Sequence, residues 1–306
     1  MTVFPAKSAA IATALLADRM LGDPQRHHPV AYFGSYATVL ERALYADSKV
    51  AGLAYVATTT LPVIVATHAL HRRAPFVTTT VTLWAALGGR TLERTGAALA
   101  RELAADNEEA ARAWIPWLCS RDPGALDATA MARAGVESVA ENTSDAAIAP
   151  IFWAAVGGAP AVALHRCINT LDAMVGYRTV RYAKFGWAAA RLDDALAYLP
   201  ARLTAAIHVA LAATPITAGS ARESWRAWRY DAAQHPSPNA GPVEATAAGA
   251  LGVQLGGATA YRHGVEQRPV LGRGRAPSVS SLRAAVRLCA GTQLVAAGLA
   301  IVLLRR

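Results

Sequence analysis

Charge is what this sequence has least of. Only 17% of its 306 residues are Asp, Glu, Lys or Arg, whereas 54% are hydrophobic and the mean hydropathy is +0.25. A soluble domain carries about 25% charged residues. The scarcity therefore argues against a soluble domain, and the segregation of the charges between apolar stretches indicates an integral membrane protein.

Familiar signatures of metal and nucleotide binding are missing as well. The three cysteines, Cys119, Cys167 and Cys289, are far apart and form no CxxC or zinc-ligand spacing, so we expect them to be reduced and structural. The chain has no Walker A loop, no GxGxxG after a strand, no GxSxG and no HExxH. A nucleotide site in this protein must therefore be of another kind.

The net charge of +9 leaves two interpretations open. Lys and Arg residues beside a membrane contact anionic headgroups, and an anionic substrate such as a phosphate or nucleotide also needs cations. Nucleic acid is not an expected partner, because the sequence has no basic stripe interleaved with aromatic residues.

Six apolar stretches predict the membrane segments, because a spanning helix needs roughly 20 apolar residues. They are Ala9–Leu21, Val50–Leu70, Phe76–Gly89, Ala146–Leu164, Ala201–Gly219 and Leu288–Leu304. We expect an all-α, polytopic helical bundle with about four to six membrane segments, placed as a multi-pass protein in the inner (plasma) membrane. Residues 1–306 would form one membrane-embedded domain, with polar loops at 22–49, 90–145, 165–200 and 220–287.

One of these stretches is interrupted. Ala146–Leu164 contains Gly157-Gly158-Ala159-Pro160 at its middle, and both Pro and Gly weaken a helix. Two interpretations are open: a single kinked helix, or two half-helices of a re-entrant hairpin that protein or a water-filled cavity covers. The long loops are all basic, which conflicts with the positive-inside rule for six simple spans. We therefore expect fewer than six.

Two further stretches have patterns of their own. Thr91–Trp117 has apolar residues at helical spacing with charges between them, so it is predicted to be an amphipathic helix on the surface of the bundle or membrane. Gly264–Ser281 is rich in Gly, Arg and Pro and is predicted to be a mobile loop.

The first candidate site residue follows the first apolar stretch. Asp23 stands in Gly22-Asp23-Pro24, shortly before His28-Pro29-Val30. A turn or a helix cap would account for an Asp at this place. The alternative is a metal or substrate contact at the mouth of a site.

Three carboxylates form the second candidate. Glu137, Glu141 and Asp145 fall at i, i+4 and i+8, so on a helix they stack on one face and repel one another. Something cationic should offset this repulsion. Arg133, one turn earlier, could pair with Glu137, and the three carboxylates also suit Mg²⁺, which prefers hard oxygen ligands.

The densest polar region combines carboxylates, an amide and a basic run. Asn169 and Asp172 stand at i and i+3, and Asp193 and Asp194 follow later. The cations between them that could grip phosphate are Arg178, Arg181 and Lys184. Interfacial salt bridges are the alternative. We favour a function, because a structural loop does not need this variety of polar types.

The last candidate is a turn rich in proline. His235-Pro236-Ser237-Pro238-Asn239 fixes a rigid bend that exposes Ser237 and Asn239. The glycines between Gly249 and Gly257 permit close helix packing or the close approach of a ligand.

Together these stretches resemble the adenosylcobinamide-phosphate synthase family, the membrane amide synthases of cobalamin biosynthesis. The motifs hold their order and spacing over most of the chain, which is more specific than any single motif. Ala173 stands where the family often has Ser, and the stretch after Gly264 matches poorly. The motifs that carry the resemblance are Leu21-Gly22-Asp23-Pro24, Ser120-Arg121-Asp122-Pro123, Glu137-Ser138, Glu141-Asn142, Asn169-Thr170-Leu171-Asp172, Arg191-Leu192-Asp193-Asp194, Pro200-Ala201-Arg202-Leu203 and Ser237-Pro238-Asn239-Ala240-Gly241.

The resemblance implies a reaction. A carboxylate of adenosylcobyric acid, a corrinoid, would be joined to (R)-1-aminopropan-2-ol or its O-phosphate, with ATP and Mg²⁺ driving amide formation. The implied catalytic residues are Asp172, Asp193, Asp194 and Glu141. The implied metal ligands are Glu137, Glu141, Asp145 and Asp23. The residues implied in substrate and phosphate binding are Asn169, Arg178, Arg181, Lys184, Arg191, Arg202, Ser237 and Asn239.

The remaining expected partners are the lipid bilayer and other membrane enzymes of the cobalamin pathway. Two functions of other classes stay open. A transporter of an anionic small molecule would use the interrupted Ala146–Leu164 segment at a midplane site. A non-catalytic membrane sensor of the same fold would keep the bundle without needing the Asp and Arg set.

Overall fold

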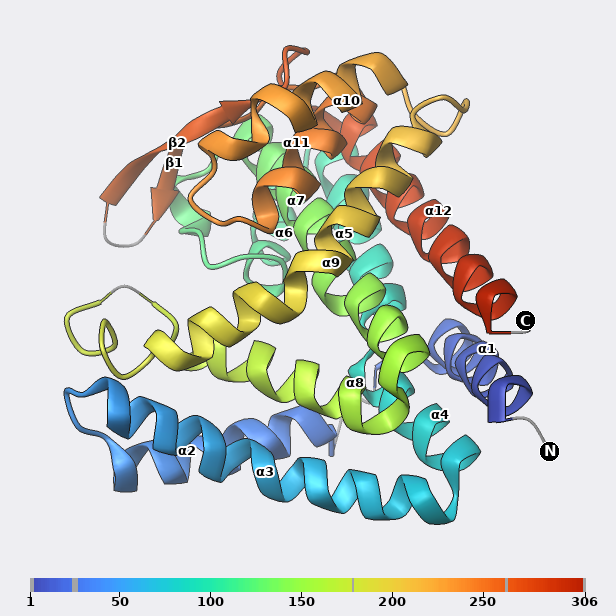
Figure 1. Cartoon of the computed structure of the whole chain (residues 1–306). Helices are drawn as coiled ribbons and strands as arrows, with labels where there is room; N and C mark the ends of the chain where they lie inside the picture. The colour runs from blue at the N-terminus through green and yellow to red at the C-terminus, as the bar shows by residue number, and fades with distance from the viewer. Residues whose placement is uncertain (1–2, 24–26, 178, 262–263, 305–306) are drawn as a thin grey trace. The chain divides into compact units, whose positions relative to one another are not determined.

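The computed structural model describes residues 3–23, 27–177, 179–261 and 264–304, and most of them are helical (Figure 1). The longer helices are α1 (Val3–Leu21), α2 (Pro29–Leu44), α3 (Lys49–Arg73), α4 (Pro75–Ala86), α5 (Gly89–Ala104), α7 (Ala128–Thr143), α8 (Ala149–Val175), α9 (Trp187–Leu211), α10 (Ala221–Tyr230), α11 (Ala240–Leu251) and α12 (Val279–Leu303). The short ones are α6 (Glu108–Arg112), η1 (Ile115–Trp117), η2 (Pro123–Ala125), η3 (Ser144–Ile148) and η4 (Ala232–Gln234). The all-α prediction is confirmed; the described strands, β1 (Leu255–Tyr261) and β2 (Gly264–Leu271), form a single antiparallel hairpin.

The chain divides into two compact units, each built from separate segments. Unit 1 comprises Met1–Gly88, Ala149–Ala197 and Ala296–Arg306, and unit 2 comprises Gly89–Ile148 and Tyr198–Val295. Helices α9 and α12 run from one unit into the other. Whether the chain acts as a single domain stays a prediction.

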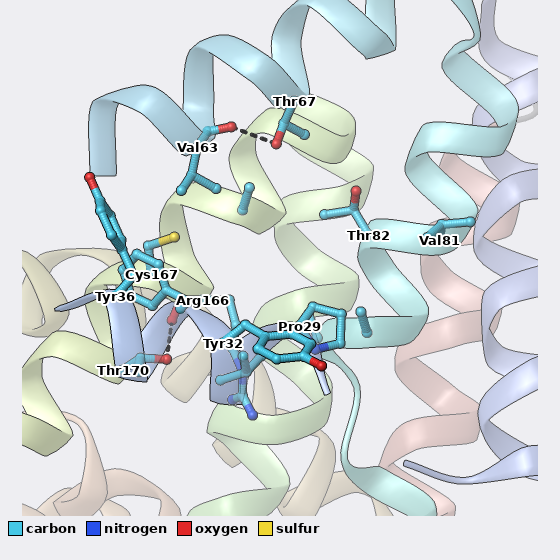
Figure 2. Close-up of a pocket in the computed structure, with 15 residues that line it drawn as sticks. Pro29, Tyr32, Tyr36, Val63, Thr67, Val81, Thr82, Arg166, Cys167 and Thr170 are labelled. Atoms are coloured by element: carbon cyan, nitrogen blue, oxygen red, sulfur yellow. Dashed lines mark hydrogen bonds between the residues drawn. The ribbon is translucent and has the colours of Figure 1, made fainter. Parts of the chain in front are cut away.

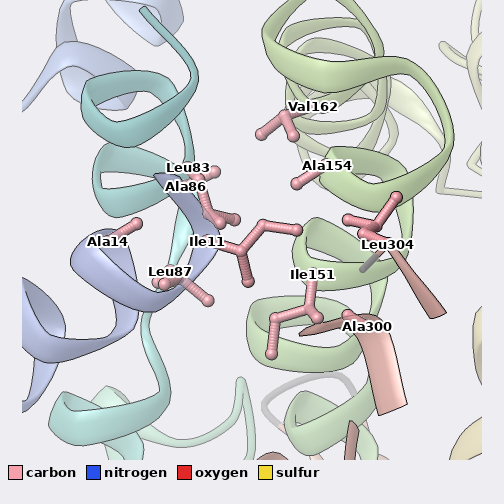
Figure 3. Close-up of a cluster of buried hydrophobic side chains, with 10 residues drawn as sticks. All are labelled: Ile11, Ala14, Leu83, Ala86, Leu87, Ile151, Ala154, Val162, Ala300 and Leu304. Atoms are coloured by element: carbon pink, nitrogen blue, oxygen red, sulfur yellow. The ribbon is translucent and has the colours of Figure 1, made fainter. Parts of the chain in front are cut away.

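Two apolar clusters hold unit 1 together. In the first, shown in Figure 3, Ile11 of α1, Leu83 of α4 and Ile151 of α8 meet and are almost fully buried. In the second, Tyr55 of α3 and Phe185 pack against α8, with their ring centroids 5.0 Å apart. These contacts position α8 against α3 and α4, so its polar residues are held by a packed framework.

Helix α8 is broken where the sequence predicts it. Gly158 has φ 64° and ψ −154°, a backbone conformation that is essentially restricted to glycine. Figure 1 shows that the two halves of α8, on either side of this residue, run in different directions. The interruption is therefore a true break between two helical halves. The re-entrant arrangement in a membrane stays a prediction.

Unit 2 is built around α5, α7, α10 and α11. Gly249 of α11 lies against α10 so closely that a Cβ there would come within 2.5 Å of the Ser224 backbone. Of the two uses that the sequence leaves open for the Gly249 position, close helix packing is the one the structure shows. Helix α10 begins at the cap residue Ser220, whose hydroxyl accepts a hydrogen bond from the Glu223 N–H.

Two predictions of local structure are wrong. Gly264–Ser281 is not a mobile loop throughout, because Gly264–Leu271 is strand β2 and its backbone groups pair with the preceding strand β1, a pairing that composition does not reveal. Thr91–Trp117 is not one helix, because the backbone at Asp106 turns to φ 53° and separates α5 from α6. The stretches predicted as polar loops are themselves largely helical.

Three of the described helical segments are long and apolar enough to cross a membrane, namely Lys49–Arg73, Ala128–Val175 and Val279–Leu303. This is fewer than six, as the sequence predicts, and also fewer than the range of four to six segments. The chain is a membrane protein by this criterion of length and composition.

We expect Gly158→Ala to lower the melting temperature of the detergent-purified protein. An alanine cannot adopt φ 64° with ψ −154° without strain, which should cost about 1–3 kcal/mol. Gly34→Ala in α2 is the matched control, because a Cβ at Gly34 meets no atom within 4 Å. Equal melting temperatures for the two variants would contradict the break at Gly158.

Candidate functional site

In unit 1, the candidate residues from α8 and α9 form one polar group. This aspartate group consists of Asn169, Asp172, Asp193 and Asp194. The Asn169 amide donates to Asp193 Oδ1 at 3.3 Å and accepts from Arg166 at 3.4 Å. Residues that are 24 positions apart in the chain are thus directly linked. The packing of α8 therefore assembles the densest polar region of the sequence into a site.

Asp193 is held in an unusual protonation state. Burial, followed by the negative charge of Asp172, raises the pKa of Asp193 to about 7, and Asp194 adds to the rise. The hydrogen bond from Asn169 opposes it. A carboxyl group that titrates near neutral pH can exchange a proton under physiological conditions, which suits a general acid or base.

Arg166 connects the N-terminal motif that contains Asp23 and His28 with the aspartate group, because it acts on His28 by charge and donates to Asn169. His28 caps α2, where its Nδ1 accepts from the Val30 N–H at 3.1 Å. Burial lowers the pKa of His28, the charge of Asp23 raises it, and the charge of Arg166 lowers it further. Asp23 and Arg166 therefore both act on His28, which places the first predicted motif beside the aspartate group.

The predicted phosphate-binding cations of unit 1 are engaged with carboxylates. Arg181 contacts Glu41 at 3.1 Å and stacks on Tyr45, and Lys184 contacts Asp47 at 2.7 Å. The Lys184–Asp47 pair is exposed on both sides, so solvent weakens it, whereas Glu41 is largely buried and also accepts a hydrogen bond from the Tyr182 hydroxyl at 2.9 Å. Arg191 is exposed on α9. Arg178 lies outside the described residues.

In unit 2, a second group of charged residues is almost completely buried. This glutamate cluster consists of Arg121, Glu137, Glu141, His235, Glu244 and Arg268. Arg121 pairs with Glu137, and both side chains are only 4% exposed. The other oxygen of Glu137 accepts from the Gly256 N–H at 2.7 Å. Glu137 is therefore satisfied by partners from two distant segments.

Arg133, the arginine that the sequence offers as a partner for Glu137, does not pair with it. Arg133 instead donates to the carbonyl oxygens of Gly256 and Ala258 on β1, at 2.9 and 2.6 Å. A residue one helical turn away is the nearest candidate in sequence, but the fold turns Arg133 toward the hairpin and brings Arg121 in from the preceding loop.

Glu244 and His235 complete the glutamate cluster. Glu244 Oε1 lies 3.6 Å from His235 Nε2 and 3.7 Å from Arg268. Burial, followed by the charges of Glu141 and Glu137, raises the pKa of Glu244 well above its ordinary value. Arg268 donates to His235 Nε2 at 2.6 Å, and the Ser237 N–H donates to His235 Nδ1 at 3.1 Å.

The remaining candidates of unit 2 have mixed outcomes. Arg202 donates to Asn239 at 2.8 Å, so two predicted binding residues do meet. The Ser237 hydroxyl accepts from the Asn239 and Ala240 N–H groups and so caps α11. Asp145 lies in the π-helical turn η3, which follows the end of α7 at Thr143. It therefore does not continue the α-helical row of Glu137 and Glu141, contrary to expectation.

The residues do not form a metal site by themselves. Within the described ranges, no three His, Cys, Asp or Glu side chains are close enough to hold a metal ion. Glu137 is occupied by Arg121, and Asp23 belongs to unit 1 whereas Glu137, Glu141 and Asp145 belong to unit 2. The four predicted metal ligands thus do not constitute a preassembled centre, and we derive no chemical step through a metal.

Sequence reasoning assigned no site role to four members of the glutamate cluster: Arg121, His235, Glu244 and Arg268. One signal was available for Glu244. It is the lone charged residue in the apolar stretch of α11, and a single charge in such surroundings needs a buried partner. Arg268 carries no comparable signal, because its stretch resembles a loop.

Comparisons with known proteins were made over the whole chain. Residues 11–289 match the family model described as CobD/Cbib protein. The chain is 48% identical to the cobalamin biosynthesis protein CobD of Mycobacterium bovis over 100% of this chain and 98% of that protein. It is 49% identical to the cobalamin biosynthesis protein CobD of Mycobacterium tuberculosis over 98% of this chain and 96% of that protein. It is 43% identical to the cobalamin biosynthesis protein CobD of Chromobacterium violaceum over 90% of this chain and 89% of that protein. No solved structure matches.

We expect Arg121→Met to destabilise unit 2, because it leaves the buried charge of Glu137 without its partner, at a cost of about 3–5 kcal/mol. The double variant Arg121→Met with Glu137→Met should recover most of this loss. Thermal unfolding of the two single variants and the double variant provides the measurement. Additive losses would show that the two side chains do not interact.

Asp193→Asn should change the pH dependence of stability. An unfolded Asp loses its proton near pH 3.8, whereas folded Asp193 keeps it until about pH 7. The folded state therefore binds more protons between these values, and stability falls as the pH rises. The variant should show a shallower fall in melting temperature from pH 4 to pH 7. Glu109→Gln, at an exposed position on α6, is the control, and identical slopes for Asp193→Asn and wild type would refute the raised pKa.

Proposed function

This chain belongs to the CobD/Cbib protein family, and from that premise we propose that it joins adenosylcobyric acid to (R)-1-aminopropan-2-ol or its O-phosphate in an ATP-dependent amide synthesis. The chain has a role in cobalamin biosynthesis as an enzyme. The observation that carries this proposal is the match to the cobalamin biosynthesis proteins over nearly the full length of both chains.

The aspartate group supports the chemistry of the amine. At neutral pH the amine arrives as an ammonium ion and must lose a proton before its nitrogen attacks the activated carboxyl carbon. As the C–N bond forms, phosphate leaves the carboxyl carbon. We assign the proton to Asp193, whose pKa of about 7 suits transfer near neutral pH. Asp172 and Asp194 hold the ammonium ion by charge, and Asn169 orients Asp193.

The basic residues support the binding of phosphate. Arg181, Lys184 and Arg191 are exposed on the unit that contains the aspartate group. A phosphate ester of the amine or a nucleotide would displace Asp47 from its exposed pair with Lys184, and would contact Arg181 on its exposed side. Arg202 and Asn239 of unit 2 form a second polar contact, which we propose for another part of the substrates.

ATP and Mg²⁺ are requirements of the proposed reaction, and the experiment tests them by omission. The detergent-purified protein is incubated with adenosylcobyric acid, ATP, Mg²⁺ and aminopropanol phosphate, and the amide product is sought by mass spectrometry. Product that disappears without ATP supports the proposal. Folded protein that gives no product with either the free or the phosphorylated amine contradicts it, and substrate flux in vesicles would then favour the transporter.

Asp194→Asn should lower the rate of amide formation by about 100-fold, the typical lower range for the loss of a group that acts on the proton or charge of the reacting amine. The effect should appear in kcat, with an unchanged melting profile in detergent. Glu109→Gln again serves as the control at an exposed carboxylate. Full activity of folded Asp194→Asn would remove the aspartate group from the mechanism.

A further inference from the structure

Unit 1 contains a cavity that the proposed reaction does not use. Its volume is about 470 Å³, and it lies among α2, α3, α4 and α8, as Figure 2 shows. The walls are mainly rings and aliphatic groups, including Phe33, Val63, Val81 and Ala163. Helix α3 and the stretch that contains α8 are both among the candidate membrane spans.

Three hydroxyl groups of the lining are already bonded to backbone carbonyls. The Thr67 hydroxyl donates to the Val63 carbonyl at 2.6 Å, and the Thr170 hydroxyl donates to the Arg166 carbonyl at 2.7 Å; both bonds are drawn in Figure 2. The Tyr36 hydroxyl donates to the Thr58 carbonyl at 3.2 Å. These hydroxyl protons are therefore taken up within the protein, and a ligand rich in amides would bury polar groups with few partners.

Arg166 is the one charged side chain among the residues that line this cavity. It is partly buried, at the edge of an otherwise apolar space. Its guanidinium can hold a phosphate by charge and by paired hydrogen bonds. The cavity is thus apolar over most of its wall and cationic at one place, which is the pattern of an amphipathic anion.

The rim continues into apolar surface. Tyr32 of α2 and Val81 of α4 are 57% and 52% exposed, although both also line the cavity. In a membrane protein, such exposed apolar side chains face acyl chains at low cost, and aromatic residues favour the headgroup region. An occupant could therefore enter from the lipid phase.

We propose that this cavity binds one anionic phospholipid, with an acyl chain between α2, α3, α4 and α8 and the phosphate at Arg166. A cavity of about 470 Å³ lies within the size range of small-ligand pockets, which suits one acyl chain. The proposal does not depend on the amide synthesis.

The test measures lipid binding and not activity, because Arg166 also donates to Asn169 of the aspartate group. Delipidated full-length protein in a neutral detergent is mixed with phosphatidylglycerol or phosphatidylcholine of the same acyl chains, and bound lipid is counted by native mass spectrometry. We expect one retained lipid, with phosphatidylglycerol preferred by about fivefold, the effect of one cation beside an anionic headgroup.

Substitutions test separately how the apolar walls of the cavity and the charge of Arg166 contribute to lipid binding. Ala163→Phe and Ala85→Leu fill the cavity from α8 and α4 and should each abolish retention of the lipid. Ala66→Phe is the matched control, because it adds a ring to an exposed face of α3 outside the lining. Thermal unfolding establishes which variants are folded. Because the two cavity-filling substitutions lie on different helices, one of them provides the test if the other fails to fold.

Arg166→Gln should bind both lipids equally, whereas Arg166→Lys should keep the preference for phosphatidylglycerol. Three outcomes would overturn the proposal: retention of lipid by the folded cavity-filling variants, equal binding of the two lipids by the wild type, or an undiminished preference in Arg166→Gln.

Discussion

A charge buried in a helical protein with few charges must have a partner, and the pairing of Arg121 with Glu137 meets this constraint for unit 2. An ion removed from water loses several kcal/mol of solvation free energy, and only a close counter-charge and hydrogen bonds offset the loss. Glu137 satisfies both requirements, since Arg121 binds one oxygen and the Gly256 N–H binds the other. The loop before η2, helix α7 and strand β1 are thereby tied to a single carboxylate.

The two groups of polar residues differ in how completely they are paired. In the glutamate cluster, His235 and Glu244 lie beside Arg268, and Arg121, Glu137, His235 and Glu244 are buried. A buried network of this kind specifies one packing arrangement. In the aspartate group, the Asn169 amide donates to Asp193, and the pKa of Asp193 is raised to about 7 by burial and by the charges of Asp172 and Asp194. Clustered carboxyls with a perturbed pKa are more typical of a functional site than of a scaffold.

The break in α8 gives the aspartate group its position. Beyond Gly158, the second half of the helix buries Ile168, Leu171 and Val175 at the spacing of one helical face, against Tyr55 and Phe185. Asn169 and Asp172 follow the first two of these residues by one position, so they lie on the adjacent face. The apolar stripe holds the helix, and the polar residues beside it are free to meet α9.

The sequence by itself determined the membrane class, the all-α fold and the position of the interruption in α8, because composition and backbone preference are local properties. It left open whether that interruption is a kink or a break. It also indicated the residues of the aspartate group, which lie in neighbouring stretches of the chain. Only the tertiary structure decided that Arg121 and not Arg133 neutralises Glu137, and that Gly256, 119 positions away, completes the contact. The tertiary structure also shows that part of a Gly- and Arg-rich stretch forms strand β2. The physical reason is that charge pairing acts between segments far apart in the chain, and packing alone selects which of several possible partners they meet. Strand β2 forms because the neighbouring strand β1 takes up its backbone hydrogen bonds, which the composition of the stretch does not reveal.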